Sequence, residues 1–402
     1  MANISSLKEK VQHEIDEIAP QLVECSDWMA DHPEIGLQEF QASARLADML
    51  EASGAEVERG IAGLPTAFRA ALSGSGLEEP TVALLAEYDA LPDVGHGCGH
   101  NIIGNAAVGA GMALSRLGRR DKLDDLPGKV VVIGTPAEEN FAGKIDLLEH
   151  GYFDGVDAAI MVHPTTRDQI AARHLAAYGI EFEFYGKPAH AAFDPYQGIN
   201  ALDAVIQTFV HIGLLRQQIR SGARIHGVIT DGGGATNVIP AYAACRFEVR
   251  AFDVGYAQDL QRRVIACAEG AATATGARLE WHAFMRPYLS YLPNDLLGGV
   301  LSANMASLGR TVGRTEEVYG STDFGNVSQV VPAAYALLSI CGPDVGWHSQ
   351  EVAAATKSER GHDTLIEAAK LLAMSAVDLL GDPDLVARVK QEHRLARAQT
   401  SE

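Results

Sequence analysis

Thr81-Val82-Ala83-Leu84-Leu85-Ala86 is a short, almost wholly apolar stretch that gives way at once to Glu87-Tyr88-Asp89. Such a run, without polar alternation, is typical of a strand buried on both faces of a sheet. A second run is Lys129-Val130-Val131-Val132-Ile133, and an Ala- and Gly-rich segment from near Asn101 lies between the two and is predicted to be helical. This alternation predicts an α/β fold in which helices cover a mixed, mostly parallel sheet.

Beyond about Ala176 the pattern changes to alternating apolar and polar residues, as in Gly179-Ile180-Glu181-Phe182-Glu183-Phe184-Tyr185. Alternation of this kind indicates strands with one buried face. The predicted order from there to Phe284 is β-α-β-β-α-β, that of a ferredoxin-like unit. We therefore expect a catalytic domain formed by residues 1–173 and 288–402, interrupted by an inserted ferredoxin-like α+β domain, residues 174–287.

The composition limits the classes of partner. The chain has 402 residues and a formal net charge of −20, which argues against nucleic acid and anionic membranes as partners. The first residues lack the apolar core of a signal peptide, and no apolar run approaches the ~18 residues of a membrane-spanning helix. Five widely spaced cysteines do not suggest a disulfide framework, so we expect a reducing, cytoplasmic location.

Side chains that bind borderline transition metals stand beside the predicted strands and turns. Two of them lie in Gly95-His96-Gly97-Cys98-Gly99-His100, a glycine-rich run that is costly to order unless it positions something. Parallel strands of open α/β sheets build their sites at their carboxyl ends, so we expect the candidates to converge. The predicted ligands are Cys98, His100, Glu139, His163 and His348.

Two carboxylates near these ligands have candidate roles of their own. The adjacent residues Glu138 and Glu139 follow a predicted strand and point in different directions. One can therefore bind metal while the other takes a proton from a metal-bound water and returns it to a leaving nitrogen. A solvated acidic loop is the alternative. Asp89 follows the first strand, where it would either orient a ligating imidazole or cap a turn.

Three further residues stand out in the predicted insert: His190, Asn237 and Arg250. Arg250 ends a predicted strand, and an arginine can grip a carboxylate through two parallel hydrogen bonds. An exposed arginine in an ordinary surface ion pair is the other interpretation.

In their order along the chain, these motifs resemble those of the dinuclear metallopeptidase family that includes aminoacylase and glutamate carboxypeptidase. The nearest branch holds aminobenzoyl-glutamate hydrolases, auxin-conjugate hydrolases and aminoacylase-like dipeptidases. The motifs that carry the resemblance are Asp31-His32-Pro33-Glu34, Glu87 to Pro92, Gly95 to Asn101, Pro136 to Glu139, Met161 to Pro164, Gly186 to Ala191, Asn237 to Pro240, Gly320 to Asp323 and Trp347-His348-Ser349.

The resemblance implies a catalytic α/β domain with two divalent metal ions, and an inserted lid that also forms a dimer interface. Zinc or manganese are the expected metals, with cobalt or nickel as further options. Cys98 would bind or bridge the metals and Glu138 would be the general base and acid. Asn237 and Arg250 would hold a substrate carboxylate, and His190 would act across a homodimer interface to stabilise the oxyanion.

The chain departs from the pattern of many relatives at two ligand positions. Cys98 stands where many have a bridging Asp, and Glu87-Tyr88-Asp89 stands where they often have His-x-Asp. The predicted function is metal-dependent hydrolysis of the amide bond of an N-acyl or N-aroyl amino acid, or of a dipeptide, with a free carboxylate. The alternatives are hydrolytic deamination of an aromatic amino carboxylate at the same site and a non-catalytic binder.

Overall fold

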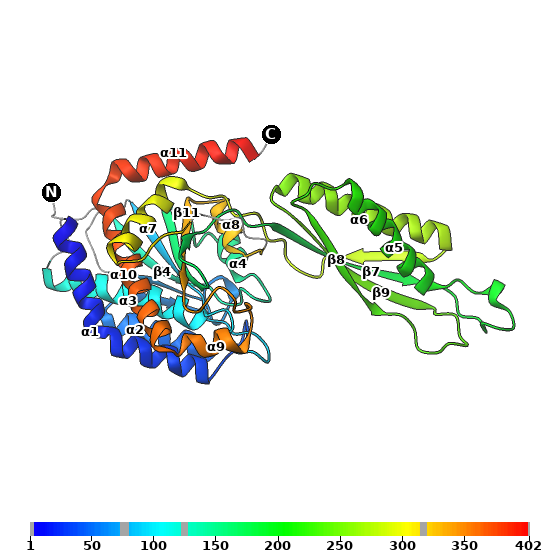
Figure 1. Ribbon diagram of the computed structural model, residues 1–402, viewed down its shortest axis with the longest axis horizontal. Coiled ribbons are helices and arrows are strands. Elements are labelled where there is room, and N and C mark those ends of the chain that lie inside the picture. The colour runs from blue at the N-terminus through cyan, green and yellow to red at the C-terminus, as the bar shows by residue number, and fades with distance from the viewer. Residues whose placement is uncertain (1–3, 73–79, 122–127, 314–319, 401–402) are drawn as a thin grey trace. The chain divides into compact units, whose positions relative to one another are not determined.

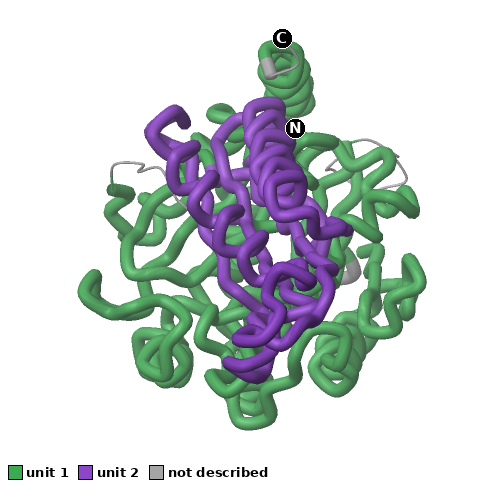
Figure 2. The backbone as a smooth tube through the Cα atoms, turned by 90° about the vertical axis from the view of Figure 1, so that its right-hand side faces the viewer, with its two compact units in different colours: residues 1–173, 291–318, 322–399 green, residues 174–290, 319–321, 400–402 purple. Residues whose placement is uncertain are grey.

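A computed structural model describes residues 4–72, 80–121, 128–313 and 320–400. The chain divides into two compact units, which Figure 2 shows in different colours. Unit 1 comprises residues 1–173, 291–318 and 322–399, and unit 2 comprises residues 174–290, 319–321 and 400–402. Within the part of the chain that the structure describes, no helix is both long and apolar enough to cross a membrane.

Unit 1 is built on a seven-stranded sheet with the order β1-β2-β4-β3-β5-β11-β6. The four central strands, β4, β3, β5 and β11, run parallel, while β1, β2 and β6 pair antiparallel at the edges. The predicted fold class, a mixed and mostly parallel sheet, is therefore confirmed. The strands are β1 Glu56–Arg59, β2 Phe68–Ala71, β3 Thr81–Ala86, β4 Lys129–Gly134, β5 Ala158–Thr165, β6 Gln169–Ile170 and β11 Ala333–Ser339.

Strand β3 shows why the sequence pattern predicted a sheet covered on both sides. Val82 and Leu84 pack into one hydrophobic core, and Ala83 and Leu85 pack into a second one. Since successive side chains of a strand point to opposite faces, both faces of the sheet are buried. Truncating Leu84, which is fully buried, to alanine would cost about 2–5 kcal/mol.

Helices surround this sheet (Figure 1). The core that holds Leu84 is closed by α1, α3 and α10, which pack on one another. The C-terminal segment forms the helix α11, in which Val386 and Val389 are buried in the core of unit 1. The helices of unit 1 are α1 Ile4–Asp31, α2 Phe40–Ser53, α3 His100–Asp121, α4 Gly143–Glu149, α7 Asp295–Ser307, α8 Phe324–Ser328, α9 Gln350–Thr356, α10 Glu359–Gly381 and α11 Pro383–Thr400, with a 3₁₀ turn at Ile61–Gly63.

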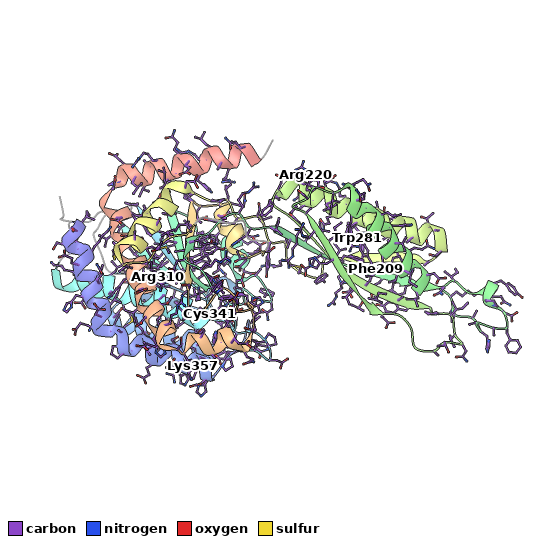
Figure 3. All side chains as sticks on the ribbon, viewed as in Figure 1. Phe209, Arg220, Trp281, Arg310, Cys341 and Lys357 are labelled. Carbon is purple, nitrogen blue, oxygen red and sulfur yellow. The ribbon has the colours of Figure 1, made fainter. Side chains whose placement is uncertain are left out.

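Unit 2 has the element order β7-α5-β8-β9-α6-β10, as the alternating pattern predicted. Its antiparallel sheet has the strand order β10-β7-β9-β8. Phe209 belongs to α5 (Figure 3), and its ring packs on that of Phe247 of β9 with the ring centroids 4.6 Å apart. The elements are β7 Ala176–Tyr185, α5 Ala201–Leu215, β8 Arg224–Asp231, β9 Tyr242–Ala251, α6 Val254–Thr275 and β10 Arg278–His282, with 3₁₀ turns at Pro195–Gln197 and Arg216–Gln218.

Local signals set the helix boundaries of unit 2. The side chain of Asn200 accepts a hydrogen bond from the backbone N–H of Leu202 at the start of α5. Asp253 caps α6 in the same way, through the N–H of Tyr256. Such caps satisfy N–H groups that the first helical turn leaves without partners.

Candidate metal centre and active site

The predicted ligands come from the carboxyl ends of the four parallel strands of unit 1. Cys98 and His100 lie between β3 and α3, where His100 is the first residue of the helix. Glu139 follows β4, and His348 follows β11. His163 lies within β5, which runs on to Thr165, so its imidazole projects from the strand itself and not from the loop after it. Because these strands are adjacent and parallel, their carboxyl ends meet at one edge of the sheet.

Backbone geometry brings the segments into contact. A side chain at Gly97 would have its Cβ 2.5 Å from Val94 Cγ1 and 3.1 Å from the carbonyl oxygen of Ser349, so only glycine allows the Cys98 loop to pack on the His348 segment. Ala137 and His348 both have positive φ, at 60° and 59°. Backbone strain of this kind in non-glycine residues is common at functional sites.

The structure brings all five predicted ligands together in two overlapping groups. Cys98, His100 and His163 form one, and Cys98, Glu139 and His348 form the other, with the ligand atoms of each group within 4.8 Å of one another. Sγ of Cys98 lies 3.5 Å from Nε2 of His163. Oε1 of Glu139 lies 3.8 Å from Nε2 of His100 and 3.7 Å from Nε2 of His348. Cys98 belongs to both groups, as a bridging ligand of two cations would.

Neighbouring acceptors aim the imidazoles. Asp89 Oδ1 accepts a hydrogen bond from Nδ1 of His100 at 2.9 Å. The backbone carbonyl of Pro164 accepts one from Nδ1 of His163 at 2.6 Å. Each ring then presents the lone pair of Nε2 to the centre, which is the tautomer that a metal-ligating histidine needs.

The residues fit a divalent cation. Nε2 of His100 and Oε1 of Glu139 are buried and have no hydrogen-bond partner among the described residues. Burial alone would lower the pKa of His100, but Cys98 and Asp89 together raise it well above its ordinary value, so the surroundings favour positive charge. Burial raises the pKa of the Cys98 thiol, and a bound metal ion would deprotonate it.

Glu138, the predicted base, lies within 4.8 Å of the ligand atoms of His100 and Glu139. Burial raises the pKa of Glu138 well above its ordinary value, and the charge of Glu139 adds to the effect. A carboxyl group whose pKa is raised in this way holds a proton more readily than an exposed one, as a general acid must.

Sequence reasoning did not single out three residues beside this centre: Glu87, Lys144 and Asp323. Lys144 is completely buried and contacts both carboxylates. No pattern marked Lys144, because one lysine at the start of a short helix is usually exposed. The motifs Glu87-Tyr88-Asp89 and Gly320-Ser321-Thr322-Asp323 were visible, but only the fold shows that they meet.

In unit 2, His190 and Asn237 lie on neighbouring segments. The N–H of Ala191 donates to the carbonyl of Asn237 at 2.9 Å, and His190 forms a bridge with Val238. Both His190 and Asn237 are exposed. Nδ1 of His190 accepts hydrogen bonds from two backbone N–H groups, each at 3.2 Å, so the ring proton lies on Nε2 as an outward donor.

Arg250 lies at the other end of the same sheet. It pairs with Ala177 at the start of β7, whereas His190 follows Tyr185, the last residue of β7. Eight residue steps of strand separate these ends, which is about 26 Å. Arg250 also donates two hydrogen bonds to Oε2 of Glu248, at 2.8 and 3.0 Å, which leaves three of its five N–H donors for another acceptor. Within one chain, Arg250 and Asn237 are therefore not brought together.

A mostly parallel α/β sheet with thiolate, imidazole and carboxylate donors at its carboxyl edge defines a metallohydrolase. Comparison with known proteins gives the family. The chain belongs to peptidase family M20/M25/M40, whose family model matches residues 83–374, and it is therefore a hydrolytic enzyme.

Two curated relatives span almost the whole chain. The Xaa-Arg dipeptidase of Mus musculus is 35% identical over 98% of this chain and 93% of its own length. One of the subunits of the p-aminobenzoyl-glutamate hydrolase of Escherichia coli (strain K12) is 29% identical over 92% of this chain and 91% of its own.

Solved structures share the fold. An aminobenzoyl-glutamate utilization protein from Klebsiella pneumoniae matches with a TM-score of 0.71 and 22% identity, over 92% of this chain and 98% of its own. A dinuclear metal-binding peptidase of the M20 family from Bacillus subtilis matches with a TM-score of 0.68 and 24% identity, over 91% and 99%.

Proposed function

We propose that this enzyme hydrolyses the amide bond of dipeptides and of N-acyl or N-aroyl amino acids that carry a free carboxylate. The observation that carries this proposal is the convergence of Cys98, His100, Glu139, His163 and His348 at one sheet edge, with Glu138 beside them. The names of the relatives support the substrate class, since they act on an Xaa-Arg dipeptide and on p-aminobenzoyl-glutamate. Neither relative is named as a deaminase or as a binding protein, so the names do not support those two alternatives.

Two divalent cations would be held by the five ligands, and zinc or manganese suit this mixed donor set, with cobalt or nickel as further options. When bound, they would polarise the scissile carbonyl and lower the pKa of water. Glu138 would take the proton from the attacking water on its carboxylate and deliver it to the departing nitrogen. Asp89 would keep the imidazole of His100 oriented throughout.

A homodimer would complete the site, and unit 2 offers a surface suited to a second copy. Ile206, Val210 and Leu214 form a stripe on the outer face of α5, with exposures of 47%, 55% and 69%. Strand β8 lies at one edge of its sheet, and its residues Val228 and Ile229 are exposed. An exposed apolar edge strand is a template for pairing with another chain, so we propose that β8 and α5 pair with their copies across a two-fold axis.

In this dimer His190 would serve the partner's active site. Its Nε2–H is a donor on an exposed loop, held there by the backbone bonds to Nδ1. A donor aimed at the tetrahedral oxyanion contributes about 3–4 kcal/mol to transition-state stabilisation in other hydrolases.

The carboxylate of the substrate would be held from both protomers. Asn237 lies next to His190 and would reach the same partner site, while Arg250, at the end of the sheet where the chain enters unit 2, would serve its own. The strand length of about 26 Å between them supports this division. A reducing cytoplasm suits the enzyme, because all five cysteines are free thiols and Cys98 must stay a thiolate ligand.

A substrate screen on metal-depleted and reconstituted protein tests the proposal. The protein is treated with a chelator, reloaded with zinc or manganese, and incubated with Xaa-Arg dipeptides, p-aminobenzoyl-glutamate and N-acetyl amino acids, with products identified by mass spectrometry. We expect cleavage to an amine and a carboxylate that is lost after chelation and returns with metal. Ammonia released from an aryl amine, with every amide intact, would support deamination instead.

A further inference from the structure

A buried ion cluster formed by Glu87, Lys144 and Asp323 lies beside the candidate metal ligands. Nζ of Lys144 is 2.6 Å from Oε1 of Glu87 and 2.7 Å from Oδ1 of Asp323, and all three side chains are at most 1% exposed. The backbone N–H of Lys144 also donates to Oδ2 of Asp323 at 3.0 Å. Burying an ion pair costs much solvation energy, so such pairs contribute little net stability. A functional role therefore explains this cluster better than a gain in stability does.

The contacts of Glu87 leave one of its oxygens facing the metal centre. Lys144 contacts Oε1, whereas Oε2 lies 3.5 Å from Nε2 of His100. That nitrogen is buried and has no hydrogen-bond partner in the described part of the chain, since Nδ1 of the same ring is the atom that bonds to Asp89.

Two atoms with lone pairs therefore face each other, Oε2 of Glu87 and Nε2 of His100, and His100 belongs to the ligand group that also contains Cys98 and His163. A carboxylate oxygen and an imidazole nitrogen at this separation can bind the same divalent cation. We propose that Glu87 is a further oxygen ligand of the cation bound by His100, and that Lys144 and Asp323 hold it in position.

The charges of the cluster agree with this role. One lysine faces two carboxylates, so the three groups together carry one negative charge in a region closed to water. A cation beside Glu87 would offset that charge, which a lysine shared by two acids cannot do fully. The inference deepens the proposed metal centre and rests on it.

Glu87→Gln provides the test, because it keeps the shape and an acceptor for Lys144 but removes the carboxylate. The purified variant is dialysed against buffered zinc and, separately, manganese, and the metal content per chain is measured together with the affinity. We expect wild-type protein to hold two cations and Glu87→Gln to bind one of them at least about tenfold more weakly. In cobalt-substituted protein, the visible absorption of that ion should also change.

Asp157→Asn is the matched control. Asp157 is a nearly buried carboxylate that pairs with Lys390 and accepts a hydrogen bond from the N–H of Thr81. Thr81 is the first residue of β3, whereas Glu87 follows the last one. This control should keep wild-type metal affinity, even if it unfolds more easily.

The double variant Glu87→Gln/Lys144→Met covers the case in which the single variant folds poorly. It replaces the ion pair by neutral side chains and keeps the net charge of the cluster, and we expect the same loss of metal affinity. Wild-type affinity for both cations in either folded variant would overturn the role of Glu87 and leave the proposed function standing. Wild-type protein that binds no cation would overturn both.

Discussion

Asp89 contacts two candidate ligands at once: its Oδ1 accepts a hydrogen bond from Nδ1 of His100 at 2.9 Å, and its Oδ2 accepts one from the backbone N–H of Glu139 at 3.0 Å. Asp89 is 1% exposed. One fully buried carboxylate therefore aligns a ligand from the loop after β3 with a ligand from the loop after β4. Its removal should disturb both.

We predict that Asp89→Asn lowers the affinity for zinc by about 10–100-fold, because partners that orient metal ligands contribute on that scale. The amide can still accept one of the two hydrogen bonds but not both. Competition with a chromophoric chelator measures the change, and Asp157→Asn serves as the control for loss of a buried acid. An unchanged affinity would show that Asp89 merely caps its turn.

Mixed dimers test whether His190 acts across the interface. In a co-expressed mixture of Glu138→Ala and His190→Ala chains, a mixed dimer has one site with both residues intact if His190 acts in the partner. Random pairing then returns about a quarter of the wild-type activity, although each variant alone is nearly inactive. If His190 acts within its own chain, the mixture stays as inactive as its components.

The same assay separates the two carboxylate-binding residues. Asn237 lies beside His190, which follows the end of β7, whereas Arg250 pairs with the start of that strand, about 26 Å of strand earlier. We therefore expect Asn237→Ala to recover activity when mixed with Glu138→Ala, and Arg250→Ala not to. Recovery by both variants, or by neither, would contradict the division of the carboxylate between protomers.

Glu39 gives a prediction about stability and pH. It is completely buried and accepts hydrogen bonds from Thr66 and from the N–H of Ala137. Burial, with the charge of Asp89 as the next cause, raises the pKa of Glu39 from 4.5 to about 7. Glu39 therefore binds its proton more tightly in the folded state than in the unfolded state. The stability that this protonation contributes is fully present below pH 4.5 and is lost as the pH rises through about 7.

Glu39→Gln removes this titration. As the pH rises from 4.5 to 8, the free energy of unfolding of the wild type should fall by about 3 kcal/mol more than that of the variant. Thermal unfolding at several pH values measures the difference, with the exposed Glu17→Gln as the control. Parallel pH profiles for wild type and Glu39→Gln would contradict the raised pKa.

The sequence predicted those elements whose own patterns are strong. The run from Thr81 to Ala86 is β3, and alternation in Gly179–Tyr185 marks most of β7. The short edge strands β1 and β2 were missed, because four residues do not establish a period. The order of the strands in the sheet could not be predicted from the hydrophobic pattern either, because β11 pairs with β5 from a distant part of the chain.

The ligands were predictable because they stand next to strands, but their surroundings were not. Nothing in the residues around Lys144 marks it as buried between Glu87 and Asp323, which lie far from it in sequence. For Arg250 the sequence predicted a role but not its surroundings. An arginine suggested binding of a substrate carboxylate, and only the structure shows that Glu248 already accepts hydrogen bonds from two of its donors.

The most direct test of the proposed function measures metal content and dipeptide hydrolysis on the same preparation of Glu138→Gln. Glu138 lies among the ligand atoms of His100 and Glu139, yet in this account it moves the proton and the five ligands hold the metal. The variant should therefore retain two cations per chain while its rate falls by about 10²–10⁴-fold. A Glu138→Gln protein with both cations and full activity would contradict the account.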